Sequence, residues 1–182
     1  MADTLIALIR GINVGRANRV AMAELRALVE ALGYTHVRTL LNSGNVVLAA
    51  AGATPGEAAD RIEEALGAQL GVSARITALT AAELDDAVAE NPLLEIADNP
   101  SRLMVAFLRD PADRAELEPL LGEDWHPEAL ALGTRVAYLW CPDGVRASRL
   151  TRAVDRALGD AVTTRNWATV RKLQALAHEG AS

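Results

Sequence analysis

Cysteine, aromatic residues and long apolar runs are all scarce in this sequence. Cys141 is the single cysteine, so no disulfide can form within the chain, which is typical of a protein from a reducing compartment. No apolar run approaches the roughly 20 residues that a membrane-spanning helix requires. The first residues include an acid, Asp3, and no basic segment of the kind that begins a secretory signal. These absences predict a cytoplasmic protein that does not associate with membranes.

The apolar residues that are present are mostly aliphatic. Aromatic residues make up 3% of the 182 residues, whereas hydrophobic residues make up 51%. This apolar content is enough for a buried core and argues against disorder. We therefore expect a globular protein whose core consists mainly of alanine, leucine, valine and isoleucine. Its length is long for one compact domain and short for two ordinary ones.

Charge is distributed unevenly along the chain. Residues 1–50 carry five arginines against three acids, residues 51–130 carry five arginines against seventeen acids, and residues 131–182 carry eight basic residues against four acids. The total of −6 argues against general nucleic-acid binding. The pattern has two interpretations. The acidic middle is a solubilising surface over helices, or the two basic ends meet and leave one positive concavity.

The first half alternates strand-like and helix-like patterns. Thr4–Arg10 is a short aliphatic run without a turn residue, as expected of a strand buried on both faces. Apolar residues recur at helical spacing from Met22 to Leu32, and Gly33 follows where a helix commonly ends. The remaining segments predict a strand, a hairpin turn, a strand, a helix and a strand at His36–Leu41, Asn42–Asn45, Val46–Ala50, Thr54–Leu70 and Ser73–Leu79. The element order is βαββαβ.

The second half repeats this order. Ala81–Glu90 is predicted to be a connecting helix, and Asn-Pro pairs at residues 91–92 and 99–100 mark the boundary between the halves. Strands are predicted at Arg102–Leu108, Ala129–Leu132, Arg135–Trp140 and Ala161–Thr164, and helices at 110–121, Val145–Leu158 and Trp167–Ala177. We therefore expect an α+β protein with two tandem βαββαβ halves and additional helices, divided into domains at residues 1–90 and 91–182.

Both faces of the first strand of each half are apolar, since Leu5–Ile9 and Met104–Leu108 are apolar at every position. A βαββαβ sheet has its own helices on one face only. We expect the second face to be covered as well, by the other half or by the extra helices.

A loop rich in glycine, asparagine and arginine follows the first predicted strand. The segment Arg10–Arg19 (RGINVGRANR) could present backbone N–H groups and guanidinium groups to an anion, which makes Arg10, Asn13 and Gly15 candidate ligand-binding residues. The segment matches neither the GxGxxG fingerprint nor a Walker A loop. The alternative is a plain strand-to-helix connection whose glycines supply backbone freedom.

Asn42–Asn45 (NSGN) forms the predicted hairpin turn, with Ser43 and Asn45 as candidate ligand-binding residues. The first and third strands of a βαββαβ sheet are antiparallel neighbours, so the end of one lies beside the start of the other. We therefore expect this turn to touch the loop at residues 11–20. The alternative is a hairpin without a binding role.

A third polar motif, Thr163–Thr169 (TTRNWAT), precedes the last predicted helix. Asn166 or Thr164 could cap that helix, while Arg165 and the helix N-terminus could face an anion. Arg165 together with Arg10 and Arg38 would then form a positive pocket across the two halves, with Asn166 beside it. A capped helix with no ligand is the alternative.

Four separated motifs resemble a bacterial family, domain of unknown function 1697. They are Arg10–Gly15 (RGINVG), Met22 with Leu25, Ser43–Val47 (SGNVV), and Thr164–Trp167 (TRNW) with Thr169 and Leu173. The resemblance runs nearly end to end and implies a duplicated ferredoxin-like α+β fold. It implies no established activity, cofactor or catalytic residue.

Other chemistry is weakly represented. The three histidines, His36, His126 and His178, have no ligand-type partner at helical spacing, so no metal site is expected. Cys141 ends a predicted strand and is expected to pack as a small apolar residue. No carboxylate lies inside the four motifs, which argues against acid–base hydrolysis and leaves no candidate catalytic residue.

The leading hypothesis is a protein that binds a small phosphorylated or otherwise anionic ligand in a basic pocket between the halves, without a cofactor. One alternative is an enzyme acting on such a ligand, and another is a protein-interaction domain with no small-molecule site. RNA binding ranks lower, because RNA-binding modules of this fold stack bases on aromatic sheet residues and neither Leu5–Ile9 nor Val46–Ala50 contains one. The sequence makes no prediction of oligomeric state.

Overall fold

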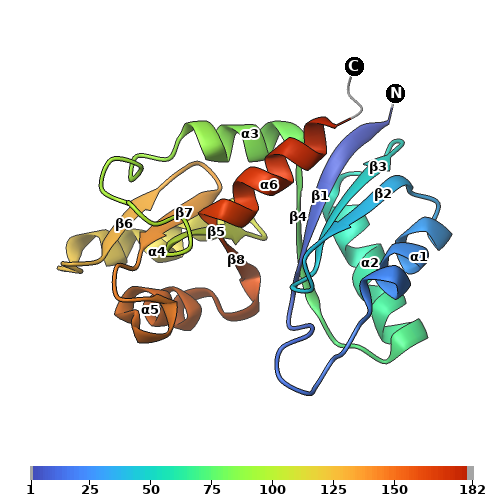
Figure 1. The fold of residues 1–182 in the computed structure, drawn as a ribbon, viewed down its shortest axis with the longest axis horizontal. Coiled ribbons are helices and arrows are strands. Elements are labelled where there is room, and N and C mark those ends of the chain that lie inside the picture. Colours follow the sequence, from blue (N-terminus) through green and yellow to red (C-terminus); the bar gives the residue numbers. More distant parts are fainter. Residues whose placement is uncertain (1, 180–182) are drawn as a thin grey trace. The chain divides into compact units, whose positions relative to one another are not determined.

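The computed structural model describes residues 2–179. They form two compact units, of which the first holds residues 2–82 together with 173–179 and the second holds residues 83–172. Figure 1 shows the helices and strands of each unit along the chain. No helix among the described residues is long and apolar enough to cross a membrane.

The first unit contains one four-stranded antiparallel sheet. Its elements are β1 (Asp3–Arg10), α1 (Met22–Ala31), β2 (Thr35–Leu40), β3 (Asn45–Ala50), α2 (Pro55–Leu70) and β4 (Arg75–Thr80). The strand order is β2-β3-β1-β4, and β1 pairs antiparallel with both β3 and β4. The predicted βαββαβ order is therefore confirmed, with β1 in the interior of the sheet and β2 at its edge.

The second unit repeats the same sheet. Its strands are β5 (Leu103–Leu108), β6 (Ala129–Leu132), β7 (Val136–Trp140) and β8 (Val162–Asn166), in the order β6-β7-β5-β8. Each strand occupies the place of its counterpart four strands earlier, which confirms the two similar halves. The helices of this part of the chain are α3 (Ala81–Ala89), α4 (Arg114–Leu117), α5 (Arg149–Leu158) and α6 (Trp167–His178).

The first crossover of the second half differs from the single helix predicted to reach Leu121. It consists of a 3₁₀ turn at Pro111–Asp113, the short helix α4, and a second 3₁₀ turn at Glu118–Gly122. Pro119 explains the break, since proline has no N–H to donate to a preceding helical carbonyl and its ring crowds the previous turn.

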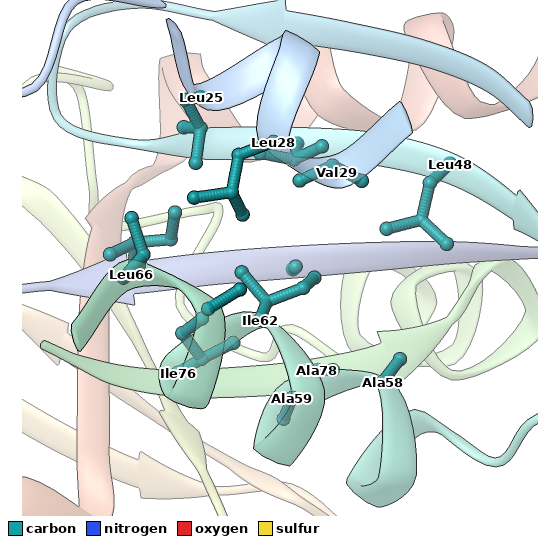
Figure 2. Packing of buried hydrophobic residues seen from close by; sticks show 14 of the residues in the cluster. Leu25, Leu28, Val29, Leu48, Ala58, Ala59, Ile62, Leu66, Ile76 and Ala78 are labelled. Atoms are coloured by element: carbon teal, nitrogen blue, oxygen red, sulfur yellow. The ribbon is translucent and has the colours of Figure 1, made fainter. Parts of the chain in front are cut away.

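The core of the first unit lies between its sheet and the helices α1 and α2 (Figure 2). Leu25, Leu28 and Val29 of α1, with Ile62 and Leu66 of α2, pack toward the sheet at helical spacing. On β1 the residues Leu5–Ile9 are all buried, with relative exposures of 0–1%. Neither face of β1 is therefore open to solvent, as expected from its unbroken apolar run.

The second unit has an aliphatic core of the same kind. Val154 and Leu150 of α5 pack with Leu139 of β7 and Leu108 of β5. Residues 83–90, in and just after α3, attach to the β6–β7 hairpin. Arg135 pairs with Glu83 at 2.9 Å, the Thr134 hydroxyl donates to Glu90, and the Tyr138 hydroxyl donates to the carbonyl of Ala87.

Candidate functional site

The head loop, residues 11–20, is held from inside by Asn13. The Asn13 side-chain amide donates to the carbonyls of Val20 at 2.9 Å and Asn42 at 2.8 Å, and its oxygen accepts from the Val20 N–H at 2.9 Å. The Asn13 backbone N–H donates to the Asn18 carbonyl at 3.0 Å. Asn13 thus fixes the loop and attaches it to the turn between β2 and β3.

The backbone of the head loop alternates between left-handed and ordinary conformations. Gly11, Asn13 and Gly15 have φ values of +90°, +55° and +66°, whereas the residues between them do not have positive φ. Such alternation turns successive N–H groups toward one side and forms concavities that bind anions. Residues 14–17 are exposed, and the N–H groups of residues 14–16 donate to no acceptor within residues 2–179. The loop therefore offers donors that the rest of the fold does not use.

The turn between β2 and β3 packs directly against the base of this loop. Gly44 has φ +90° and its carbonyl accepts from the Ile9 N–H at 2.8 Å. A Cβ at position 44 would lie 2.7 Å from Ile12 Cδ1 and 2.9 Å from Ile9 Cβ, so only glycine fits here. With the bond from Asn13 to Asn42, this packing confirms the predicted contact between loop and turn.

Asn45, predicted to bind the ligand, is fully buried. Its side-chain amide donates to the Leu40 carbonyl at 2.7 Å and to the Ser43 hydroxyl at 3.1 Å. These bonds close the turn, so Asn45 and Ser43 hold its shape. The structure thus brings Asn13, Ser43 and Asn45 together at one end of the first sheet, in roles that position the backbone.

Two arginines of the head loop differ from Arg10 in their side-chain contacts. Arg16 and Arg19 are exposed, and neither has a hydrogen-bond or ion-pair partner in the part of the chain that the structure describes. Arg19 lines a cavity of about 430 Å³ together with Asn13, Asn42 and Glu24. Sequence reasoning recognised the arginine-rich loop but selected Arg10, which ends β1 opposite Arg75 of β4. Only the side-chain contacts distinguish the three arginines.

Arg38, predicted to join the same pocket, lies on the edge strand β2 and lines a different cavity. That cavity, of about 600 Å³, is lined by residues from β1, α1, β2, β3 and the end of α6, and none of the head loop is among them. Arg38 pairs with Glu179, with 3.3 Å between Nη1 and the carboxylate oxygen.

The two candidate residues of the second unit lie at the end of β8. Asn166 accepts a hydrogen bond from the Thr169 N–H at 2.9 Å, so it is the N-cap of α6. Arg165 lies opposite Val105 in the sheet, and its Nη1 donates to the Thr164 carbonyl at 3.0 Å. A role for either residue beside the arginines of the first unit stays a prediction.

Cys141 is fully buried beside Ser148 and Thr151, with its sulfur 3.5 Å from the Ser148 hydroxyl oxygen. Burial raises the pKa of the Cys141 thiol, and the nearby Glu128 acts in the same direction, whereas the hydrogen bonds with Ser148 and Thr151 oppose it. The thiol is therefore protonated at neutral pH and packs as a small apolar group. Within residues 2–179 no group of three or more metal-ligating side chains is present.

Comparison with known proteins agrees with this fold. The model of a family described as "Protein of unknown function (DUF1697)" matches residues 2–138. Among solved structures, the conserved bacterial protein SP0830 from Streptococcus pneumoniae is similar, with a TM-score of 0.78 and 19% sequence identity over 97% of this chain and 99% of that one. At this identity the likeness shows the fold alone. No curated protein matches.

Proposed function

The chain belongs to the family described as protein of unknown function DUF1697, and we propose that it binds a small anionic ligand, of the phosphate class, at the head loop of its first unit. The family supplies no chemistry, so the proposal comes from the loop itself. One observation carries it. A loop fixed internally by Asn13 and Asn18 presents unused backbone amides and two unpaired arginines on the same exposed segment.

Each part of the loop has a separate role in this proposal. Gly15 gives the left-handed conformation that turns the amides outward. Arg16 and Arg19 supply guanidinium groups, whose fork geometry matches phosphate oxygens. Asn13, Ser43 and Asn45 hold the loop and turn in place, and Arg10 adds positive charge at the end of β1. Because the loop is already ordered, it loses less conformational entropy when the ligand binds, which favours affinity.

Glu24 opposes the binding of an anion at this site. It lines the cavity beside Arg19 and places a carboxylate in the first turn of α1. An anion held by Arg19 is repelled by this carboxylate, most strongly at low ionic strength. The site therefore favours a ligand whose negative charge lies near the N–H groups of the head loop and away from Glu24.

Thermal-shift measurements with inorganic phosphate, sugar phosphates and nucleotides, at fixed ionic strength, test the proposal. An anion at about 100 times its Kd stabilises the folded protein by about 2.7 kcal/mol, which is several degrees for a chain of this size. We expect Arg16→Ala or Arg19→Ala to weaken binding about tenfold, equivalent to about 1.4 kcal/mol. Arg165→Ala tests the contribution that the sequence predicted from the second unit.

Arg152→Ala is the matched control, since Arg152 is exposed on α5 and has no partner within residues 2–179. It should leave the thermal shift unchanged. Equal losses in Arg152→Ala and Arg19→Ala would mean that the anions act through general charge, and the absence of a shift with every anion would remove the proposed site.

A protein-interaction surface is the second candidate, on one specific observation. Val14 in the head loop and Leu41 in the adjoining turn have exposed fractions of 75% and 50%. Val14 follows Asn13 and Leu41 precedes Asn42, and Asn13 is hydrogen-bonded to Asn42. The two apolar residues therefore lie at the same end of the sheet. Val14→Ser with Leu41→Ser should leave phosphate binding intact if the anion is the ligand.

A further inference from the structure

A second site lies at the edge of the first sheet, around Arg38. The cavity of about 600 Å³ described above is bounded by Arg38 and His36 of β2, Arg26 and Glu30 of α1, and Glu179. Its size falls within the range of small-molecule sites, which run from about 300 to 1,000 Å³.

Arg38 uses only part of its hydrogen-bonding capacity here. Nη1 makes both contacts with Glu179, at 3.5 Å to the backbone carbonyl and 3.3 Å to the carboxylate. Both are long for charge-assisted bonds. Nε is buried and has no acceptor, and Nη2 donates to no acceptor within residues 2–179. A buried charged donor without an acceptor is costly, so this edge of the guanidinium is suited to a partner that the fold does not supply.

The backbone of β2 is irregular at the point where it presents this arginine. The pairing of β2 with β3 shifts between Thr35 and Arg38, and His36 has φ +50°. Val37 is buried in the core of the first unit, while Arg38 and His36 line the cavity. A bulge of this kind re-aims side chains, and bulges are over-represented at sheet edges and beside active sites. His36 therefore keeps an uncommon left-handed conformation two residues before Arg38, at a point where both residues line the cavity.

The charges around the cavity select the kind of anion. Arg26 is already paired with Glu30, at 3.0 Å, and Glu179 opposes Arg38. The lining arginines and carboxylates balance, so a doubly charged phosphate would meet two carboxylates with one guanidinium edge to hold it. A singly charged carboxylate matches that edge, with two oxygens for Nε–H and Nη2–H.

We propose that this cavity binds a small organic carboxylate, whose two oxygens accept hydrogen bonds from Nε–H and Nη2–H of Arg38. Its apolar part lies along Ala49 and Ala177, which also line the cavity. The site is distinct from the head loop in position and in ligand charge, and it does not depend on the function proposed there.

The Nε–Hε signal of Arg38 in a ¹H–¹⁵N spectrum reports directly on the new bond. The signal is assigned by its loss in Arg38→Lys, which keeps the positive charge near Glu179. Sodium butyrate is titrated at fixed ionic strength, with sodium phosphate and sodium chloride as comparisons. Butyrate should shift the Hε signal downfield to a plateau, whereas chloride should not, and backbone amides of residues 48 and 49 should follow the same curve.

The variants separate a binding site from a structural ion pair. Arg38→Lys should weaken butyrate binding at least about tenfold, because lysine cannot form the bidentate contact. Arg26→Lys should change it less than about twofold. Glu179→Gln should strengthen it by roughly twofold to fivefold, the range expected when one exposed opposing charge is removed.

The proposal is overturned if butyrate leaves the Arg38 Hε signal unchanged, if Arg38→Lys binds butyrate as the unmodified chain does, or if Glu179→Gln weakens binding. Arg19→Ala must leave the butyrate titration unaffected and alter only the response to phosphate. A failure at the head loop and a failure at Arg38 are therefore distinguishable.

Discussion

At the scale of single residues, the first unit concentrates uncommon backbone conformations around the head loop and its neighbouring turn. Asn13, Asn18 and Leu41 all have positive φ without being glycine. Asparagine tolerates this region because its short side chain bonds locally, as Asn13 and Asn18 both do. Leucine has no such compensation. Strain of this kind gathers at functional sites, and Leu41 adjoins the loop at which we propose anion binding.

Leu41→Asn should stabilise the protein. Leu41 has φ +61° and an exposed fraction of 50%, so asparagine relieves backbone strain with little loss of burial. We expect the free energy of unfolding to rise by about 0.5–1 kcal/mol, as part of the cost of about 1–2 kcal/mol for a left-handed L-residue is recovered. Leu121→Asn is the control, since Leu121 is 51% exposed with ordinary φ. If urea unfolding gave Leu41→Asn a change in the free energy of unfolding no more favourable than that of this control, backbone strain at Leu41 would be contradicted.

Residue roles were predictable only where local pattern determines them. Gly44 and the cap at Asn166 follow from short-range signals. The functions of Asn13 and Arg38 depend on partners 29 and 141 positions away, at Asn42 and Glu179. No spacing rule along the sequence connects such pairs, so the arginines that lack partners could be recognised only from the structure.

At the scale of elements, the sequence was most informative where apolar periodicity is strong. β1 and α1 were predicted to within a residue, and the loop–turn contact followed from strand order alone. The segment from Pro111 to Gly122 was wrongly predicted to be a single helix, because Pro119 interrupts the helix that the spacing of its apolar residues suggests. β8 runs on to Asn166, two residues beyond the prediction, because Arg165 and Asn166 pair with β5.

The helices α1 and α2 differ at their N-termini, and this difference is testable. Thr54 forms a capping box with Glu57, and these hydrogen bonds hold the pKa of Glu57 below its usual value. Ala21 occupies the N-cap position of α1 with extended backbone and no side-chain bond. We expect Thr54→Ala to lower the free energy of unfolding by about 1 kcal/mol, and Ala21→Ser to raise it by about 0.5–1 kcal/mol. Denaturant unfolding of both variants checks this, and equal effects of the same sign would contradict it.

At the scale of the whole molecule, the duplicated sheet order and the uneven charge are the dominant features. Both units use the order in which the first strand lies between the third and fourth, so one βαββαβ pattern is built twice. Residues 173–179 nevertheless belong to the first unit and residues 83–90 to the second. Sequence order therefore predicts the sheets well, whereas the assignment of the connecting and final helices depends on tertiary contacts such as Arg38–Glu179 and Thr134–Glu90.

The function proposed for the molecule requires that its stability responds to anions through one loop. The chain carries a net charge of −6, so nonspecific attraction of anions is weak and a saturable response must come from a local site. Glu24→Gln should then strengthen phosphate binding by roughly twofold to fivefold, because a carboxylate lining the cavity is removed. Isothermal titration calorimetry at low and high salt measures this, and weaker binding in Glu24→Gln would place the anion elsewhere.

The most direct test follows backbone amide signals by NMR while inorganic phosphate is added at constant ionic strength. We expect the amides of residues 14–17 to shift to a common plateau, and Arg19→Ala to move the midpoint to higher phosphate. Shifts that never saturate, or that saturate while residues 14–17 stay unchanged, would contradict the assignment of anion binding to the head loop.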